Sequence, residues 1–105
     1  MYRYVVVEAA EMNAELLESK LVAAVMRLSG VIGLAKVEPA VVYMRADKGL
    51  AVVRVKREGL RLFRAALAAH KEPLARVVKV AGTLRKARAI CSSLYGESAG
   101  LSEGA

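Results

Sequence analysis

The segment VVYMRADKGLAVVRV, residues 41–55, decides the fold of this chain. It holds two apolar runs separated by Asp47-Lys48-Gly49, residue types that favour a tight turn. Two such runs joined by a short turn predict an antiparallel hairpin, which we expect to pair Leu34–Met44 with Leu50–Val55. Pro39 cannot donate a hydrogen bond to a sheet, so it marks an edge, a bulge or the true start of the first strand.

A strand and a helix are expected before the hairpin. Tyr2–Ala9 is rich in Val and alternates in the manner of a strand. Asn13 is a favourable N-cap and apolar residues recur at helical spacing, which predicts a helix over Asn13–Leu28 that ends at Gly30. Its apolar surface is wider than one packing face requires, which indicates either wide burial or a protein partner. The additional apolar residues are Leu16, Val22, Ala23 and Met26.

Three more elements are expected after the hairpin. A helix over Arg57–Ala69 presents an apolar face, and Pro73 then directs the chain into a strand over Ala75–Ala81. Gly82-Thr83 is a turn and N-cap for a last helix, Leu84–Tyr95, which Gly96 ends. The small, polar tail at 97–105 is expected to be flexible.

The order β-α-β-β-α-β followed by a helix predicts an α+β, ferredoxin-like fold, the split β-α-β arrangement of RRM-like domains. We expect a four-stranded antiparallel sheet with two helices on one face and an additional C-terminal helix. The length of 105 residues suits one domain, which we place at 1–96. The open face of such a sheet is a common nucleic-acid surface, but the fold alone assigns no function.

The positive charge lies in the second half of the chain. The formal net charge is +7, with 17 Lys and Arg against 10 Asp and Glu. Residues 1–44 contain more acids than bases, whereas 45–88 are strongly basic. This asymmetry favours a basic surface directed at a polyanion, of which nucleic acid is the commonest, over charge that serves solubility alone.

Few residues suit catalysis or metal binding. His70 stands alone near the end of a helix, and Cys91 lies on the apolar side of the last helix. One Cys and one His cannot form a disulfide or a structural zinc site, and the acidic residues show no paired spacing suited to metal binding or acid–base catalysis. We therefore expect neither catalytic nor metal-binding residues. The uncharged runs are well short of the ~20 residues that span a bilayer, and we therefore expect a cytoplasmic protein that is not in a membrane.

Two basic clusters and one separate arginine are candidates for contact with nucleic acid. Gly82-Thr83 leads into a helix whose first turns carry Arg85, Lys86 and Arg88, an arrangement suited to phosphate. An ordinary capped helix with a solvated basic face explains it equally well. Arg57, Arg61 and Arg64 have helical spacing, which on its own more often indicates a solvated face. Arg54 interrupts an apolar strand and is expected on the open face of the sheet, near Lys79.

The sequence offers little for base stacking. Tyr2 and Tyr4 could stack on unpaired bases, although packing within the sheet is the more frequent role. Leu50–Val55 contains no aromatic residue, so the stacking platform of a standard RNA recognition motif is missing from that strand. Sequence-specific recognition of a single strand is therefore not expected.

Five blocks of residues together form a recognisable pattern. They are Arg3-Tyr4; Gly33-x-Ala35-Lys36-x-x-Pro39; Val52-Val53-Arg54 with Arg57; Phe63-Arg64 with Leu67; and Val80-Ala81-Gly82-Thr83-Leu84-Arg85-Lys86. With them the chain resembles the archaeal and eukaryotic Pop5 family, ribonuclease P protein component 2, over about residues 2–90. The last block is the most specific, although the family usually has Ser where this chain has Ala81.

The resemblance implies a non-catalytic protein subunit of ribonuclease P, the ribonucleoprotein that removes the 5′ leader from precursor tRNA. In that family the RNA with its Mg²⁺ ions performs the hydrolysis, and the protein itself binds no cofactor. The implied partners are the ribonuclease P RNA, the Rpp30 subunit and other ribonuclease P proteins, with a homodimer inside a heterotetramer. We assign RNA contact to Arg54, Arg57, Arg64, Gly82, Thr83, Arg85, Lys86 and Arg88.

Two other classes of protein share this expected topology. One is a ferredoxin-like protein-interaction or regulatory domain whose basic residues serve solubility. Its RNA binding would be absent or insensitive to salt. The other is a small enzyme such as an acylphosphatase. The enzyme is the weaker alternative because the sole Asn, Asn13, is better used as a helix cap than in catalysis.

Overall fold

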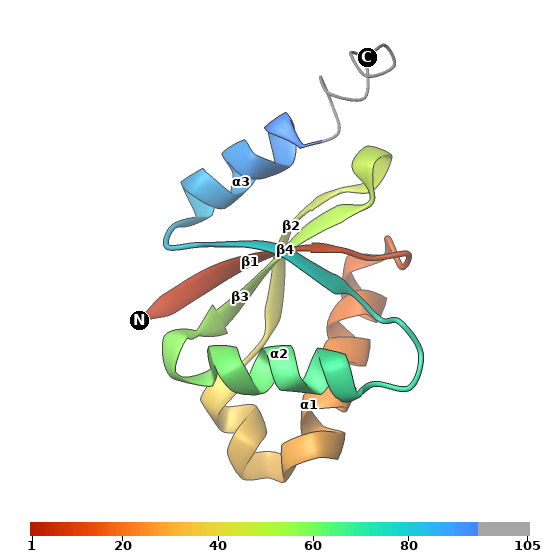
Figure 1. The fold of residues 1–105 in the computed structure, drawn as a ribbon, viewed down its shortest axis with the longest axis vertical. Helices are drawn as coiled ribbons and strands as arrows, with labels where there is room; N and C mark the ends of the chain where they lie inside the picture. Colours follow the sequence, from red (N-terminus) through yellow and green to blue (C-terminus); the bar gives the residue numbers. More distant parts are fainter. Residues whose placement is uncertain (95–105) are drawn as a thin grey trace.

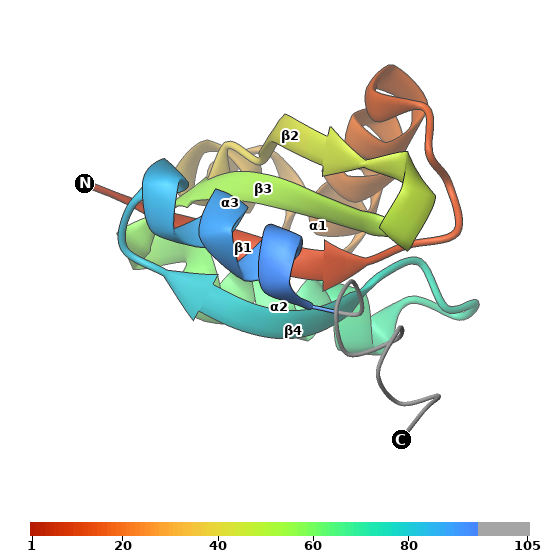
Figure 2. The same cartoon turned by 90° about the horizontal axis from the view of Figure 1, so that it is seen from above.

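The computed structural model describes residues 1–94 and confirms the ferredoxin-like arrangement. Figure 1 shows the whole fold. The sheet is antiparallel with strand order β2-β3-β1-β4 (Figure 2). The elements are β1 Tyr2–Glu8, α1 Ala14–Val37, β2 Ala40–Arg45, β3 Leu50–Lys56, α2 Leu60–Ala69, β4 Arg76–Ala81 and α3 Leu84–Ser93, with short 3-10 turns η1 at Ala46–Lys48 and η2 at Arg57–Gly59.

Helices lie on both faces of the sheet. Helices α1 and α2 cover one face and α3 lies across the other (Figures 1 and 2). The alternation of β1 explains this arrangement, since Val5 and Val7 face α1 and α2 whereas Val6 packs under α3. The face expected to be open is therefore partly covered by the C-terminal helix, and Ala87 and Cys91 of α3 are fully buried against it.

The first helix is longer than the sequence predicts. We expected Gly30 to end it and a strand to begin at Leu34, but α1 runs to Val37 and β2 begins at Ala40, directly after Pro39. At Gly30 the backbone has φ 71° and ψ −167°, so the chain bends there and then resumes the helix. A glycine can either end a helix or bend it, because the side-chain restriction on φ is absent in both cases. Of the three alternatives expected for Pro39, an edge, a bulge or the true start of the strand, the last is confirmed by the position of β2.

The bend makes glycine at position 30 important for stability. Gly30→Ala is expected to lower the free energy of unfolding by about 1–3 kcal/mol, because this combination of φ and ψ is almost exclusive to glycine. The new methyl group would meet no other atom within 4 Å, so the effect would come from the backbone alone. Urea unfolding followed by circular dichroism measures it. An unchanged unfolding midpoint would show that the bend is not required in solution.

The other elements agree with their predicted positions, with two exceptions. Arg57 lies in η2 and not in α2, which begins at Leu60. Helix α3 ends at Ser93 among the described residues; Tyr95, Gly96, the domain boundary at 96 and the tail 97–105 lie outside them. No helix within residues 1–94 is both long enough and apolar enough to cross a membrane.

Candidate nucleic-acid interface

Arg54 lies on the face of the sheet that α3 partly covers. It pairs with Tyr4 of β1 and Ala40 of β2, and it shares its face with Val52, as expected. Its guanidinium carbon lies 4.8 Å from the centre of the Tyr2 ring, a cation–π distance. Its Nε atom is buried and has no hydrogen-bond partner within residues 1–94. Lys79 is exposed on the same face but lies on β4, with β1 between it and β3.

The turn before α3 confirms the predicted cap. Thr83 has extended φ and ψ, and its hydroxyl accepts a hydrogen bond from the backbone N–H of Lys86 at 3.2 Å. Gly82 is exposed, and a side chain there would meet no atom within 4 Å. Ala81 is buried beneath α3, where it packs with Ala87 and Cys91. The helix is therefore capped by the side chain of Thr83.

The basic residues of α3 point in different directions. Arg85 and Arg88 line one hollow between α3 and β2, together with Tyr43. The guanidinium carbon of Arg88 lies 4.9 Å from the centre of the Tyr43 ring. Lys86 does not line this hollow, and on an α-helix it lies about 160° from Arg88. Arg54, Arg85 and Arg88 thus share one side of the sheet, and we call them the α3-side arginines.

The second predicted row lies on the other side of the sheet. Arg61 and Arg64 are exposed on α2, and Arg57 is exposed in η2, where its backbone N–H donates to the Met1 carbonyl at 2.9 Å. Arg57 therefore does not continue the helical stripe. The structure thus separates Arg57 and Arg64 from the predicted contact residues around α3, and within residues 1–94 the arginine–tyrosine contacts lie on the α3 side.

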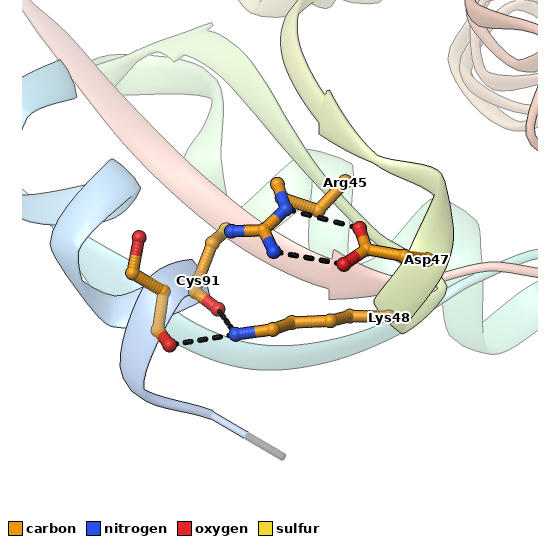
Figure 3. A network of polar contacts seen from close by, with 5 residues as sticks. Arg45, Asp47, Lys48 and Cys91 are labelled. Carbon is orange, nitrogen blue, oxygen red and sulfur yellow. Dashed lines mark hydrogen bonds and ion pairs between the residues drawn. The ribbon is translucent and has the colours of Figure 1, made fainter. Parts of the chain in front are cut away.

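Lys48, which the sequence analysis did not single out as functional, holds the C-terminal end of α3. Its Nζ atom donates to the carbonyl oxygens of Cys91 at 3.0 Å and Ser92 at 2.6 Å (Figure 3). These are carbonyls of the last turn, which have no partner inside the helix. The contact fixes α3 to the turn between β2 and β3. No sequence signal predicts it, because the two ends meet only in the folded chain.

Replacing Lys48 by Met is expected to loosen the end of α3, because Met retains the aliphatic stem and cannot donate a hydrogen bond. Two hydrogen bonds from a charged group are lost, so the amides of the last turn should exchange at least tenfold faster with solvent deuterium. Hydrogen exchange read by mass spectrometry measures this rate. Lys71→Met, in the exposed segment after α2, is the matched control. Equal exchange in both variants would contradict the role given to Lys48.

Arg45 and Asp47 form an ion pair beside this contact (Figure 3). Two nitrogen atoms of Arg45 donate to the two carboxylate oxygens of Asp47, at 3.0 and 2.8 Å. The hydrogen bonds to Asp47, together with the nearby Tyr43 side chain, raise the pKa of Arg45, and the same guanidinium lowers the pKa of Asp47. Arg45 is therefore fixed to Asp47. Tyr43 could not be selected from the sequence, because its position on the α3 side depends on strand register.

Comparison with known proteins places these residues in a family. The sequence profile of the Rpp14/Pop5 family matches residues 3–92, and the match includes all eight predicted contact residues. The chain belongs to the Rpp14/Pop5 family. A search of curated protein sequences finds no match. Among solved structures, a chain of the cryo-EM structure of yeast ribonuclease MRP is similar to this Rpp14/Pop5 protein, with a TM-score of 0.56 and 14% identity over 99% of this chain and 95% of that chain. At that identity the likeness confirms the fold.

The remaining candidates for catalysis or metal binding in this Rpp14/Pop5 chain are Cys91 and His70. Cys91 is fully buried, and burial raises the pKa of its thiol, which disfavours the reactive thiolate. His70 follows the end of α2, and its Nδ1 atom lies 2.7 Å from the Glu72 carbonyl oxygen. Within residues 1–94 no three His, Cys, Asp or Glu side chains are grouped to hold a metal ion. The basic surface is therefore the feature best suited to function.

Proposed function

We propose that this chain is a protein subunit of ribonuclease P that assists the RNA subunit in removing the 5′ leader from precursor tRNA. One observation carries the proposal: the family match includes the α3-side arginines, which lie on one face beside two tyrosines. Within residues 1–94 no ion pair occupies any of these three arginines. Their guanidinium groups are thus available to phosphate oxygens.

The protein acts in this proposal through phosphate neutralisation. Folding of a catalytic RNA brings phosphates together, and cations are needed to offset their repulsion. Fixed arginine side chains perform part of this work, so the RNA requires less Mg²⁺ to reach its active fold. Hydrolysis is carried out by the RNA with its Mg²⁺ ions. Arg57, Arg64 and Lys86, on other surfaces, are proposed to make secondary RNA contacts.

The test is cleavage of precursor tRNA at limiting Mg²⁺ by the ribonuclease P RNA of the same organism. The RNA is assayed alone, with this chain and Rpp30, and with Rpp30 alone. We expect cleavage at low Mg²⁺ only in the complete mixture. If omission of this chain leaves cleavage unchanged, the subunit proposal is wrong and a ferredoxin-like interaction domain without RNA binding takes its place.

We also propose a homodimer within a heterotetramer with Rpp30, and that α1 supplies the contact between the two copies. Leu28, Val31 and Ile32 are 45%, 67% and 76% exposed around the bend at Gly30. The segment 28–33 carries no charge, whereas the chain as a whole has a net charge of +7. Two copies meeting through this segment bury apolar surface without bringing like charges together.

The dimer proposal predicts that Ile32→Glu halves the number of copies of this chain in its complex with Rpp30, because it places two carboxylates at the symmetric contact. Light scattering of the purified complex measures the mass. Ala23→Glu, at another exposed position of α1, is the control and should retain the wild-type mass. A wild-type mass for Ile32→Glu would contradict the dimer contact. If the variant loses Rpp30 but both copies of this chain stay together, the segment 28–33 binds Rpp30 instead.

A further inference from the structure

We propose that the hollow between α3 and β2 binds one unpaired RNA base, stacked against the Tyr43 and Arg88 pair. This inference rests on the proposed function, because it names a subsite for the same RNA. The hollow has a volume of ≈ 460 Å³. Its lining combines an aromatic ring, two guanidinium groups and small or apolar side chains: Tyr43, Leu84, Arg85, Arg88, Ala89 and Ser92.

A β-bulge directs Tyr43 into this hollow. Val41 pairs with Val53 and Tyr43 pairs with the adjacent Val52, so β2 has one more residue than β3 at this point. Val41 packs on the side of α1 and α2, whereas Val42 and Tyr43 both pack on the side of α3. Without the bulge, alternation would place Tyr43 on the same side as Val41. The irregular register thus presents the ring to α3.

The walls of the hollow are held by contacts of the β2–β3 hairpin. Tyr43 lies on β2 two residues before Arg45, which two hydrogen bonds fix to Asp47. On the opposite side of the hollow, Lys48 fixes the last turn of α3 (Figure 3). Both walls are therefore attached to the same β2–β3 hairpin. A rigid aromatic surface loses little conformational entropy when a flat ligand stacks on it.

The chemistry of the lining favours a nucleotide. Aromatic rings and arginine guanidinium planes are the groups on which proteins stack unpaired bases. Arg85 lies on the same flank of α3 and can meet the adjoining phosphate. The sequence from residue 73 to residue 96 contains five basic residues and no acidic one, so this part of the surface attracts polyanions. A paired base is already stacked inside its helix, which leaves an unpaired base as the ligand.

The site for base stacking differs from that of a standard RNA recognition motif. A standard RNA recognition motif stacks bases on aromatic residues in the middle of its sheet. Here α3 occupies that area, and the strand β3 provides Val52 beneath it. The ring beside α3 that lines the hollow is on β2, at the edge of the sheet. Stacking at one position is tolerant of base identity, which agrees with the lack of sequence-specific recognition expected from the sequence.

Photo-crosslinking tests the position of the base. Ribonuclease P RNA containing 5-iodouridine is bound to the full chain with Rpp30 and irradiated, and the crosslinked peptides are identified by mass spectrometry. The expected product is a crosslink at Tyr43. RNA that binds with normal salt dependence and crosslinks only elsewhere would overturn the inference and leave the proposed function intact. Absence of salt-dependent binding would instead overturn the proposed function.

A pair of substitutions tests the stacking itself. Tyr43→Leu is expected to weaken binding of a single-stranded oligouridine about tenfold, and Tyr43→Phe, which keeps the ring, to change it by less than about threefold. Neither should alter the salt dependence, since no charge is removed. A duplex RNA of equal length is the control ligand, and circular dichroism verifies folding. Equal affinities for the oligouridine in all three folded proteins, or an equal loss on the duplex, would overturn the inference.

Discussion

Replacing Arg85 and Arg88 together with Ala is expected to weaken binding to ribonuclease P RNA about 100-fold. Both side chains line the hollow beside Tyr43, and neither is engaged by an ion pair within residues 1–94. Hydrogen bonds from a charged group contribute about 1.5–3 kcal/mol each, so the loss of two corresponds to at least this factor. The slope of log affinity against log salt should become shallower by about 2, because two fewer phosphates are neutralised.

The control for this variant removes the same charge from another surface. Lys36→Ala with Lys71→Ala also eliminates two positive charges, at exposed positions at the end of α1 and after α2. Affinities of both double variants are measured by filter binding over a range of KCl concentrations. We expect the control to stay within about threefold of the unmodified chain. If both variants lose affinity equally, RNA binding depends on net charge and not on the α3-side arginines.

Gly59→Ala is expected to lower the free energy of unfolding by about 3 kcal/mol or more. A methyl group at this position would lie 2.3 Å from the Lys36 carbonyl oxygen and 2.7 Å from the Val37 Cα atom. Both atoms belong to the backbone of α1, so relief of the clash requires the whole end of that helix to move. Overpacking in a rigid interior costs typically 1–3 kcal/mol, and more where side-chain rotation cannot relieve it.

Gly82→Ala is the matched control for Gly59→Ala. The added methyl group meets nothing within 4 Å, and Gly82 does not have a positive φ, so stability should change by no more than about 0.5 kcal/mol. Urea unfolding curves of the two variants provide the comparison. If Gly59→Ala lowers the free energy of unfolding by less than 1 kcal/mol, the end of α1 can move away from η2 at little cost. The close contact at Gly59 would then have no role in holding α1 against η2.

The order of strands and helices could be predicted because local signals agree with the tertiary arrangement. Asp47-Lys48-Gly49 predicted the hairpin turn, and the Thr83 cap predicted the start of α3. The extension of α1 beyond Gly30 could not be predicted, since helix-ending and helix-bending glycines look the same in a sequence. In the folded chain Gly33 and Val37 are buried against the core, so the helix continues past Gly30. This burial depends on residues distant in the chain.

The candidate site was predictable in composition but not in arrangement. Periodicity correctly placed Arg54 on the face of Val52 and Thr83 at the helix cap. Alternation along β3 places Arg54 on the α3 side, whereas Arg57 lies in η2 and Arg64 in α2, on the other side of the sheet. This separation is known only once the sheet is assembled. The importance of Tyr43 depends on a bulge, and Lys48 acts on carbonyls far along the chain.

The central position of β1 has a consequence for how the chain folds. This first strand to be synthesised pairs with β3 on one edge and with β4 on the other, and Tyr4 lies opposite Ala81 across most of the described chain. Such distant pairing slows folding, because long loops must close before contacts form. A nascent chain that ends before β4 leaves one edge of β1 unpaired and Val6 uncovered. We therefore expect cooperative folding late in synthesis, after α3 has left the ribosome.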